Sequence, residues 1–119
     1  IRSKPAASRT WMAEKIVAIA DFSIVPIGTG KTSMGVYIAA AVRAIEKDKR
    51  IRCEVTSMGT IMEGERLEDL LAAVGRAHEA VFAKGIKRIE SVVKIDDRRD
   101  KPRTKELKVS RIKAEIAKI

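Results

Sequence analysis

Residues 16–25 alternate between apolar and mixed side chains, and this pattern constrains the fold more strongly than any other feature of the sequence. One set of alternate residues is wholly apolar, whereas the other set includes Asp21 and Ser23 beside three aliphatic residues. A period of two places successive side chains on opposite faces of a strand. The pattern therefore predicts a strand with one face in a core and a second face of mixed character.

Two later segments have helical spacing. Residues 36–48 place apolar side chains at i, i+3, i+4 and i+7, and residues 67–81 carry a stronger stripe of the same kind. Thr32 or Ser33 can cap the first helix, and Gly85 follows the second, where a left-handed cap is expected. Three further strands are predicted, at residues 51–58, 60–63 and 88–95. The resulting order is β-α-β-β-α-β.

This order is typical of the ferredoxin-like α+β fold, in which a four-stranded antiparallel sheet carries both helices on one face. The second face of such a sheet must be covered by a ligand, another subunit or solvent. The alternation assigns to this open face a set of polar and apolar residues, namely Asp21, Ser23, Glu54, Thr56, Met58, Glu90 and Val92. Such a mixture is too apolar for plain solvent and too acidic for a plain core.

The net charge of +9 comes from 25 basic and 16 acidic residues, and it suggests a polyanionic partner. However, residues 16–97 hold 12 of each and are neutral, so that all of the excess lies in the two ends. We interpret residues 1–14 as a flexible basic leader or an added extension. Residues 15–101 form the predicted ferredoxin-like domain. The charge therefore indicates solubility and steering rather than the identity of a ligand.

Residues 102–119 are predicted to form an additional C-terminal amphipathic helix. Pro102 precedes it and Thr104 can act as its N-cap. Its apolar stripe is narrow and consists of Val109, Ile112, Ile116 and Ile119. The stripe requires a partner, which is either the helix's own domain or a neighbouring subunit.

Most catalytic, metal-binding and membrane functions find little support in the residues. The longest apolar run, Val36 to Val42, has seven residues, whereas a membrane span needs about 20. Cys53 is alone, which predicts neither a disulfide framework nor a cysteine metal site and fits a reducing cytoplasm. His78 is the single histidine and is interpreted as a packed or interface side chain, because no orienting partner is evident. We therefore predict no catalytic residue and no bound metal.

Two remaining motifs are weak. Gly30-Lys31-Thr32 resembles the end of a phosphate-binding loop, but the glycine required five residues before Gly30 is Val25. Three glutamates near the start of the second helix are interpreted as solvent-facing or helix-start carboxylates, namely Glu63, Glu65 and Glu68.

An RNA-binding domain is a less favoured alternative. RNA recognition by this topology needs aromatic side chains on the central strands, and the chain has four aromatic residues in total. Acidic groups on the open face would also repel phosphate. A regulatory module that senses another small molecule remains a second alternative.

Three blocks of sequence resemble the thiamine-binding protein family. They are IADFSIVPIGTG, EVTSMGTIMEG and AHEAVFAKGIKRIESVVKIDDRRDKP, and the resemblance covers about residues 15–110. The second block and the segment KIDDRRD are its most specific parts. The resemblance implies a non-catalytic protein that binds thiamine or its hydroxymethylpyrimidine part, with no required cofactor.

The resemblance also implies an assembly and a binding site. Members of this family pair sheet to sheet as homodimers and assemble into homotetramers, so that the ligand lies on the open face near a subunit interface. The implied ligand-binding residues are Asp21, Ser23, Gly28, Thr29, Glu54, Thr56, Met58, Gly59 and Thr60. An acidic side chain would stabilise the thiazolium cation, while hydroxyls and backbone amides would bind the pyrimidine.

Overall fold

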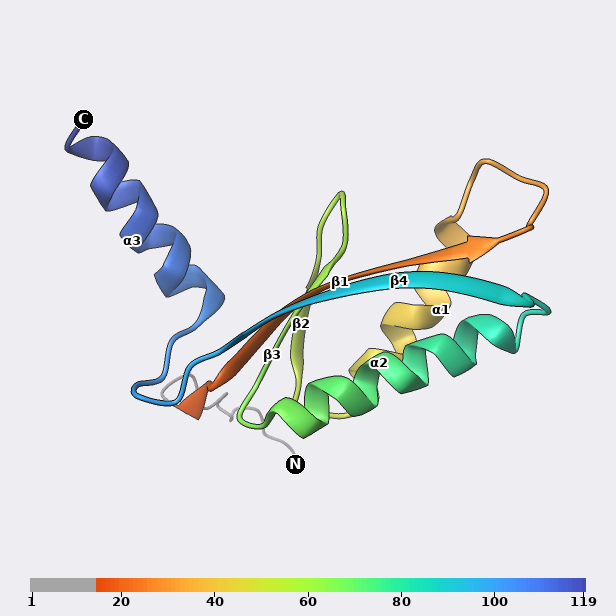
Figure 1. The fold of residues 1–119 in the computed structure, drawn as a ribbon, viewed down its shortest axis with the longest axis horizontal. Helices are drawn as coiled ribbons and strands as arrows, with labels where there is room; N and C mark the ends of the chain where they lie inside the picture. Colours follow the sequence, from red (N-terminus) through yellow and green to blue (C-terminus); the bar gives the residue numbers. More distant parts are fainter. Residues whose placement is uncertain (1–14) are drawn as a thin grey trace, which may run out of the picture.

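The computed structural model describes residues 15–119, so the predicted leader at residues 1–14 lies outside the described residues. The chain forms the expected β-α-β-β-α-β order followed by a third helix (Figure 1). The elements are β1 (Ala18–Ile27), α1 (Gly35–Glu46), β2 (Arg52–Val55), β3 (Thr60–Gly64), α2 (Leu67–Phe82), β4 (Arg88–Asp97) and α3 (Lys105–Ala117).

The four strands form one sheet in the order β2-β3-β1-β4, and every neighbouring pair is antiparallel. The core lies between one face of this sheet and the helices α1 and α2. The predicted ferredoxin-like α+β fold, with its four-stranded sheet and its extra C-terminal helix, is therefore confirmed.

The alternation in β1 assigns the two faces of the sheet correctly. Ala18, Ala20, Phe22 and Ile24 are buried beneath the helices, where they meet Met62 of β3. The intervening residues of β1 face the opposite side, and their antiparallel partners on β3 and β4 face that side with them. We call this second side the open face.

The ends of the elements differ in part from the prediction. α1 begins at Gly35 with Met34 as its N-cap and without a side-chain cap, so the expected capping by Thr32 or Ser33 is wrong. The reason is that the glycine-containing turn continues to residue 34 before the helix starts. By contrast, Gly85 adopts the expected left-handed conformation after α2, with a φ of 91°.

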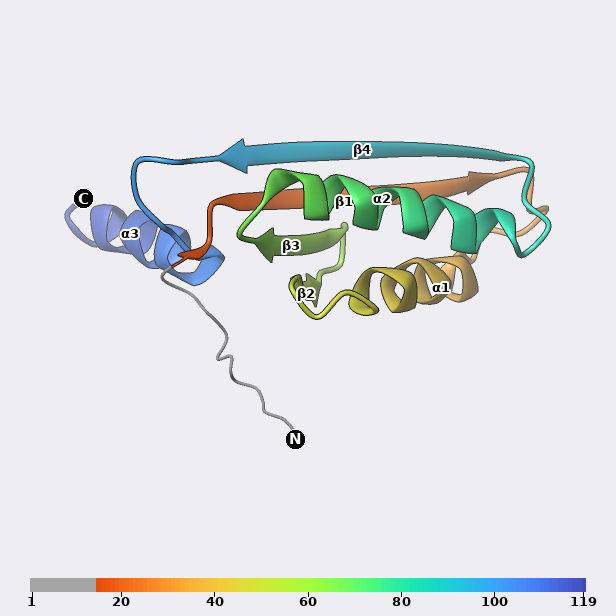
Figure 2. The same cartoon turned by 90° about the horizontal axis from the view of Figure 1, so that it is seen from below.

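α3 reaches the domain mainly through its first turns. Thr104 is its N-cap, as predicted, and accepts a hydrogen bond from the backbone N–H of Leu107 at 3.2 Å. No residue of α3 is buried, and the helix extends beyond one end of the sheet, away from α1 and α2 (Figures 1 and 2). The apolar stripe predicted on this helix consequently remains exposed in the single chain.

Among residues 15–119, none of the helices combines the length and the apolar character that crossing a bilayer requires.

Candidate functional site

The open face carries both charged and apolar side chains at each of its ends. At one end, Ile19 of β1 lies opposite Glu63 of β3 and Asp96 of β4. At the other end, Val25 and Ile27 lie opposite Glu90 and Arg88 of β4. α3 lies over the first of these ends, where its first turns contact β2 and β3.

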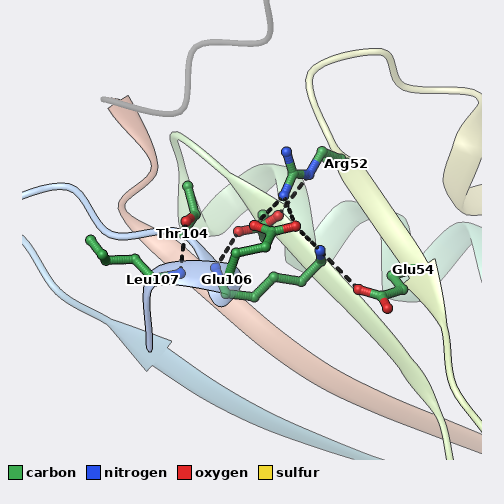
Figure 3. Close-up of polar contacts among 7 residues, drawn as sticks. Arg52, Glu54, Thr104, Glu106 and Leu107 are labelled. Carbon is green, nitrogen blue, oxygen red and sulfur yellow. Dashed lines mark hydrogen bonds and ion pairs between the residues drawn. The ribbon is translucent and has the colours of Figure 1, made fainter. Parts of the chain in front are cut away.

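Glu63 anchors α3 to the sheet, within the network of polar contacts around Arg52 and Glu106 that Figure 3 shows. Its side chain is fully buried, and its Oε2 accepts a hydrogen bond from the backbone N–H of Lys105 at 2.7 Å. Its Oε1 lies 2.9 Å from Nε of Arg52, on the neighbouring strand. The interpretation of Glu63 as a solvent-facing or helix-start carboxylate is therefore wrong, because α3 returns from 42 residues later in the chain to cover it.

Glu106 extends this network towards the solvent. Its carboxylate lies 2.5 Å from Nη2 of Arg52 and also contacts Nζ of Lys105. Partial burial opposes ionisation of Glu106, but the hydrogen bond from Lys105 and the charge of Arg52 outweigh it and lower its pKa to about 2. Nζ of Lys105 also lies 2.8 Å from Oε1 of Glu54. Burial disfavours the charged form of Lys105, yet these two carboxylates raise its pKa.

A groove of about 680 Å³ lies between the open face and α3, and we call it the α3 groove. Its apolar walls come from the sheet and from the helix, and its polar groups come from the same two sides. Its lining includes Ile19, Glu54, Ile61, Lys105, Val109 and Ser110. A groove with apolar walls and a few convergent polar groups can hold a small molecule with both apolar and charged parts.

A second and smaller cavity of about 150 Å³ lies beside the turn between β2 and β3, and we call it the turn pocket. It brings together five of the predicted ligand-binding residues, namely Ser23, Thr56, Met58, Gly59 and Thr60. Met34 and three residues of α1 form its other side. Its volume is below the roughly 300 Å³ at which pockets for drug-sized ligands begin.

Local hydrogen bonds explain the shape of the β2–β3 turn. The backbone N–H of Thr56 donates to the carbonyl oxygen of Gly59 at 2.7 Å, and Oγ1 of Thr56 accepts from the N–H of Gly59 at 3.1 Å. A Cβ atom at Gly59 would lie 2.8 Å from the carbonyl oxygen of Phe22 and 3.0 Å from Oδ1 of Asp21. The turn thus rests directly on β1, which only glycine permits.

The structure does not gather all of the predicted ligand-binding residues at one place. Glu54 and Thr56 line the α3 groove, whereas Asp21 lines neither cavity and lies on the open face between Ile61 and Lys94. Thr60 lines the turn pocket but is buried opposite Phe22, on the side of the helices.

Gly28 and Thr29 lie beyond the far end of β1. Gly28 follows Asp21 by seven steps along an extended chain, which corresponds to about 23 Å. Oγ1 of Thr29 accepts a hydrogen bond from the backbone N–H of Lys31 at 3.0 Å, so this side chain shapes the turn. These two residues are therefore not brought close to the α3 groove.

Sequence reasoning missed the contribution of α3 to the groove. Lys105, Glu106, Val109 and Ser110 line it, and no periodicity in the strands could have indicated them. The alternation of apolar and mixed residues in β1 does place Ile19 on the open face. It could therefore have indicated that Ile19 lines a site on that face.

The lone histidine and the lone cysteine have structural environments. Nε2 of His78 lies 2.8 Å from Oγ of Ser91, and its ring packs beside Phe22 and Phe82. This agrees with the interpretation of a packed histidine. Cys53 is half-buried in β2, and burial raises the pKa of its thiol. Within residues 15–119 no group of three or more metal-ligating side chains is present.

The sequences and structures of known proteins match most of the length of this chain. A UPF0045 protein of Methanothermobacter thermautotrophicus is 44% identical over 97 residues, which are 82% of this chain and 97% of that protein. The crystal structure of a hypothetical protein of Methanocaldococcus jannaschii superposes with a TM-score of 0.72 and 35% identity, over 81% of this chain and 95% of that chain.

A more distant structure has the same fold. It belongs to a protein of Thermotoga maritima described as a candidate thiamine biosynthesis/salvage protein, and it superposes with a TM-score of 0.65 at 23% identity, over 80% of this chain and 97% of that chain. The family model of the thiamine-binding proteins matches residues 20–113. This range includes β1 from its third residue onward, the other three strands, both helices of the domain and most of α3. With this match and these relatives, the chain belongs to the thiamine-binding protein family.

Proposed function

We propose that this protein binds thiamine or its hydroxymethylpyrimidine part in the α3 groove, without chemical turnover. The proposal rests on the groove between the open sheet face and α3. The chain that forms this groove belongs to the thiamine-binding protein family. Its volume of about 680 Å³ lies within the range of roughly 300–1,000 Å³ that is usual for small-molecule sites.

The chemistry of the groove matches the two parts of thiamine. Ile19, Ile61 and Val109 offer apolar contact to flat rings. The carboxylate of Glu54 provides a countercharge for the thiazolium cation, and the hydroxyl of Ser110 can bind the aminopyrimidine edge. The neutral pyrimidine part would use the apolar walls and the hydroxyl without needing the carboxylate.

Calorimetric titration with thiamine and with hydroxymethylpyrimidine tests the proposal. The matched pair Val109→Lys and Ile112→Lys places the same side chain on α3 inside and outside the groove, at positions that are 52% and 62% exposed. We expect Val109→Lys to abolish binding and Ile112→Lys to preserve it. Absence of heat with both ligands at millimolar concentration, on a folded sample, would overturn the proposal. If the two variants lose the same binding affinity, the ligand does not bind in the α3 groove.

We further propose that two copies pair through their open faces and that these dimers form a homotetramer. The open face bears aliphatic side chains away from the groove, among them Val25, Ile27 and Val92, and Val92 is 66% exposed in the single chain. Exposed apolar residues that cluster on one side are typical of an interface between subunits. The groove would then lie beside this interface.

The proposal that no turnover occurs is consistent with the position of the histidine–serine pair. His78 and Ser91 contact each other, yet neither lines the α3 groove or the turn pocket. Incubation with thiamine followed by chromatography should therefore return the vitamin unchanged, and any product would contradict this part of the proposal.

RNA binding is less consistent with the open face. Phe22 points to the core, and the other aromatic residues of the described chain, Tyr37 and Phe82, belong to helices. The open-face strands of residues 15–119 therefore offer no aromatic side chain for stacking on bases.

A thermal-shift screen against a panel of small molecules would identify the regulatory alternative, in which another compound binds in place of thiamine.

A further inference from the structure

Lys105 occupies the position in the α3 groove that a ligand cation would need. It is the first residue of α3, and its side chain is 17% exposed. Its Nζ lies 2.8 Å from Oε1 of Glu54 and also contacts the carboxylate of Glu106. The ammonium group therefore already serves as the countercharge for the acids of the groove.

We propose that Lys105 is an internal competitor that determines how strongly the groove binds cations. A cationic ligand must displace the ammonium group of Lys105 from Glu54, whereas a neutral ligand need not. The inference rests on the proposed function for the location of the site, and it adds a specificity-determining residue to that site.

The backbone of Lys105 is held independently of its side chain. Its N–H donates to the buried carboxylate of Glu63, so that α3 stays anchored when the ammonium group moves away. The unbranched stem of lysine has several rotatable bonds, which makes such a movement inexpensive compared with moving a helix. Lys105 can thus leave the acids without opening the groove.

The two acids differ in what they retain after Lys105 moves. Both carboxylate oxygens of Glu106 lie 2.5 Å from Nη2 of Arg52, so Glu106 keeps a partner. Within residues 15–119, the ion pair recorded for Glu54 is the one with Lys105. Displacement therefore releases Glu54 in particular, and its carboxylate becomes available to the ligand.

The central test replaces Lys105 by methionine, which is uncharged and has a similar stem. We expect Lys105→Met to bind thiamine about fivefold more tightly than the original protein, because the ammonium group no longer competes for Glu54 and a partly exposed ion pair contributes a factor of this order. The affinity for neutral hydroxymethylpyrimidine should stay within about twofold. The double variant Lys105→Met with Glu54→Gln should lose the gain for thiamine.

Matched controls separate this effect from general electrostatics and from misfolding. Lys113→Met removes another positive charge of the groove, and we expect it to give a smaller gain because Lys113 has no recorded ion pair with the acids in the described chain. Circular dichroism establishes that each variant is folded. If Lys105→Met does not fold, Lys105→Gln serves in its place.

The outcomes distinguish the inference from the proposed function. If hydroxymethylpyrimidine binds but Lys105→Met leaves thiamine affinity unchanged, or if Lys113→Met gives the same gain, the inference is overturned and the proposed function stands. If neither compound binds any variant, the proposed function is overturned. Tetramethylammonium then decides the inference by NMR titration: stronger binding to Lys105→Met than to the original protein supports it, and equal binding overturns it.

Discussion

At the scale of single residues, the site depends on the buried carboxylate of Glu63. It combines a hydrogen bond to the first N–H of α3 with an ion pair to Arg52. Removal of one partner from a buried charge pair is costly, because the remaining charge loses both water and its counterion. Glu63 therefore determines where α3 begins, although it lies far from α3 in the sequence.

The substitution Glu63→Gln should lower the free energy of unfolding by about 1–3 kcal/mol, because a charged acceptor becomes neutral beside Arg52. Urea denaturation measures this change. Glu65→Gln is the matched control, since Glu65 is exposed and its replacement should cost less than about 0.5 kcal/mol. Equal effects in both variants would mean that burial of Glu63 has no energetic importance.

Glu106 predicts a dependence of stability on pH. Its pKa is lowered from 4.5 to about 2 in the folded chain, so the ionised form favours folding. This contribution is fully present above pH 4.5 and is lost as the pH falls towards 2. Urea unfolding at several pH values should show a smaller loss of stability in Glu106→Gln than in the original protein. An identical pH profile in the two proteins would contradict this assignment.

At the scale of elements, strand patterns were predictable and the docking of α3 was not. The alternation in β1 predicted both faces because a strand has a fixed period of two. The environment of Glu63 depends instead on a helix that returns from distant sequence, and no local pattern of residues encodes such a tertiary contact. Similarly, Gly28 appears close to Asp21 in the sequence, but an extended strand of ten residues carries it to the other end of the sheet.

Two glycines provide a matched test of the packing of these elements. Gly59→Ala should destabilise the fold by about 1–3 kcal/mol, because its Cβ would lie 2.8 Å from the carbonyl oxygen of Phe22. Gly75→Ala on the exposed side of α2 should stabilise it by about 0.5–1 kcal/mol, since nothing lies within 4 Å and alanine favours helices. Thermal and urea denaturation measure both effects. A tolerated Gly59→Ala would show that the turn does not rest on β1.

At the scale of the whole molecule, the excess positive charge does not lie on the sheet. Residues 16–97, which hold all four strands, are neutral in total and expose aliphatic side chains on the open face, whereas α3 belongs to the basic C-terminal end and exposes basic and aliphatic side chains together. The neutral open face is consistent with the proposed pairing of copies through this face.

The substitution Val92→Lys tests this association. Val92 lies on the open face opposite Ser23, so a lysine there would place like charges together in a face-to-face pair. We expect sedimentation equilibrium to show a smaller assembly than that of the original protein, with unchanged circular dichroism. Glu79→Lys, on an exposed position of α2, is the control and should preserve the assembly. A monomeric original protein would contradict the proposed pairing.

Because α3 is attached to the sheet by its first turns, the rest of the helix moves whenever the attached end rotates. Its 13 residues extend about 20 Å, and the distal half projects beyond the sheet. A small rotation at the anchored end changes the width of the groove, and the same rotation displaces the distal end by a much larger distance. If a second copy binds that distal end, both subunit assembly and ligand binding in the α3 groove depend on the orientation of α3. Ligand affinity would then rise or fall with protein concentration.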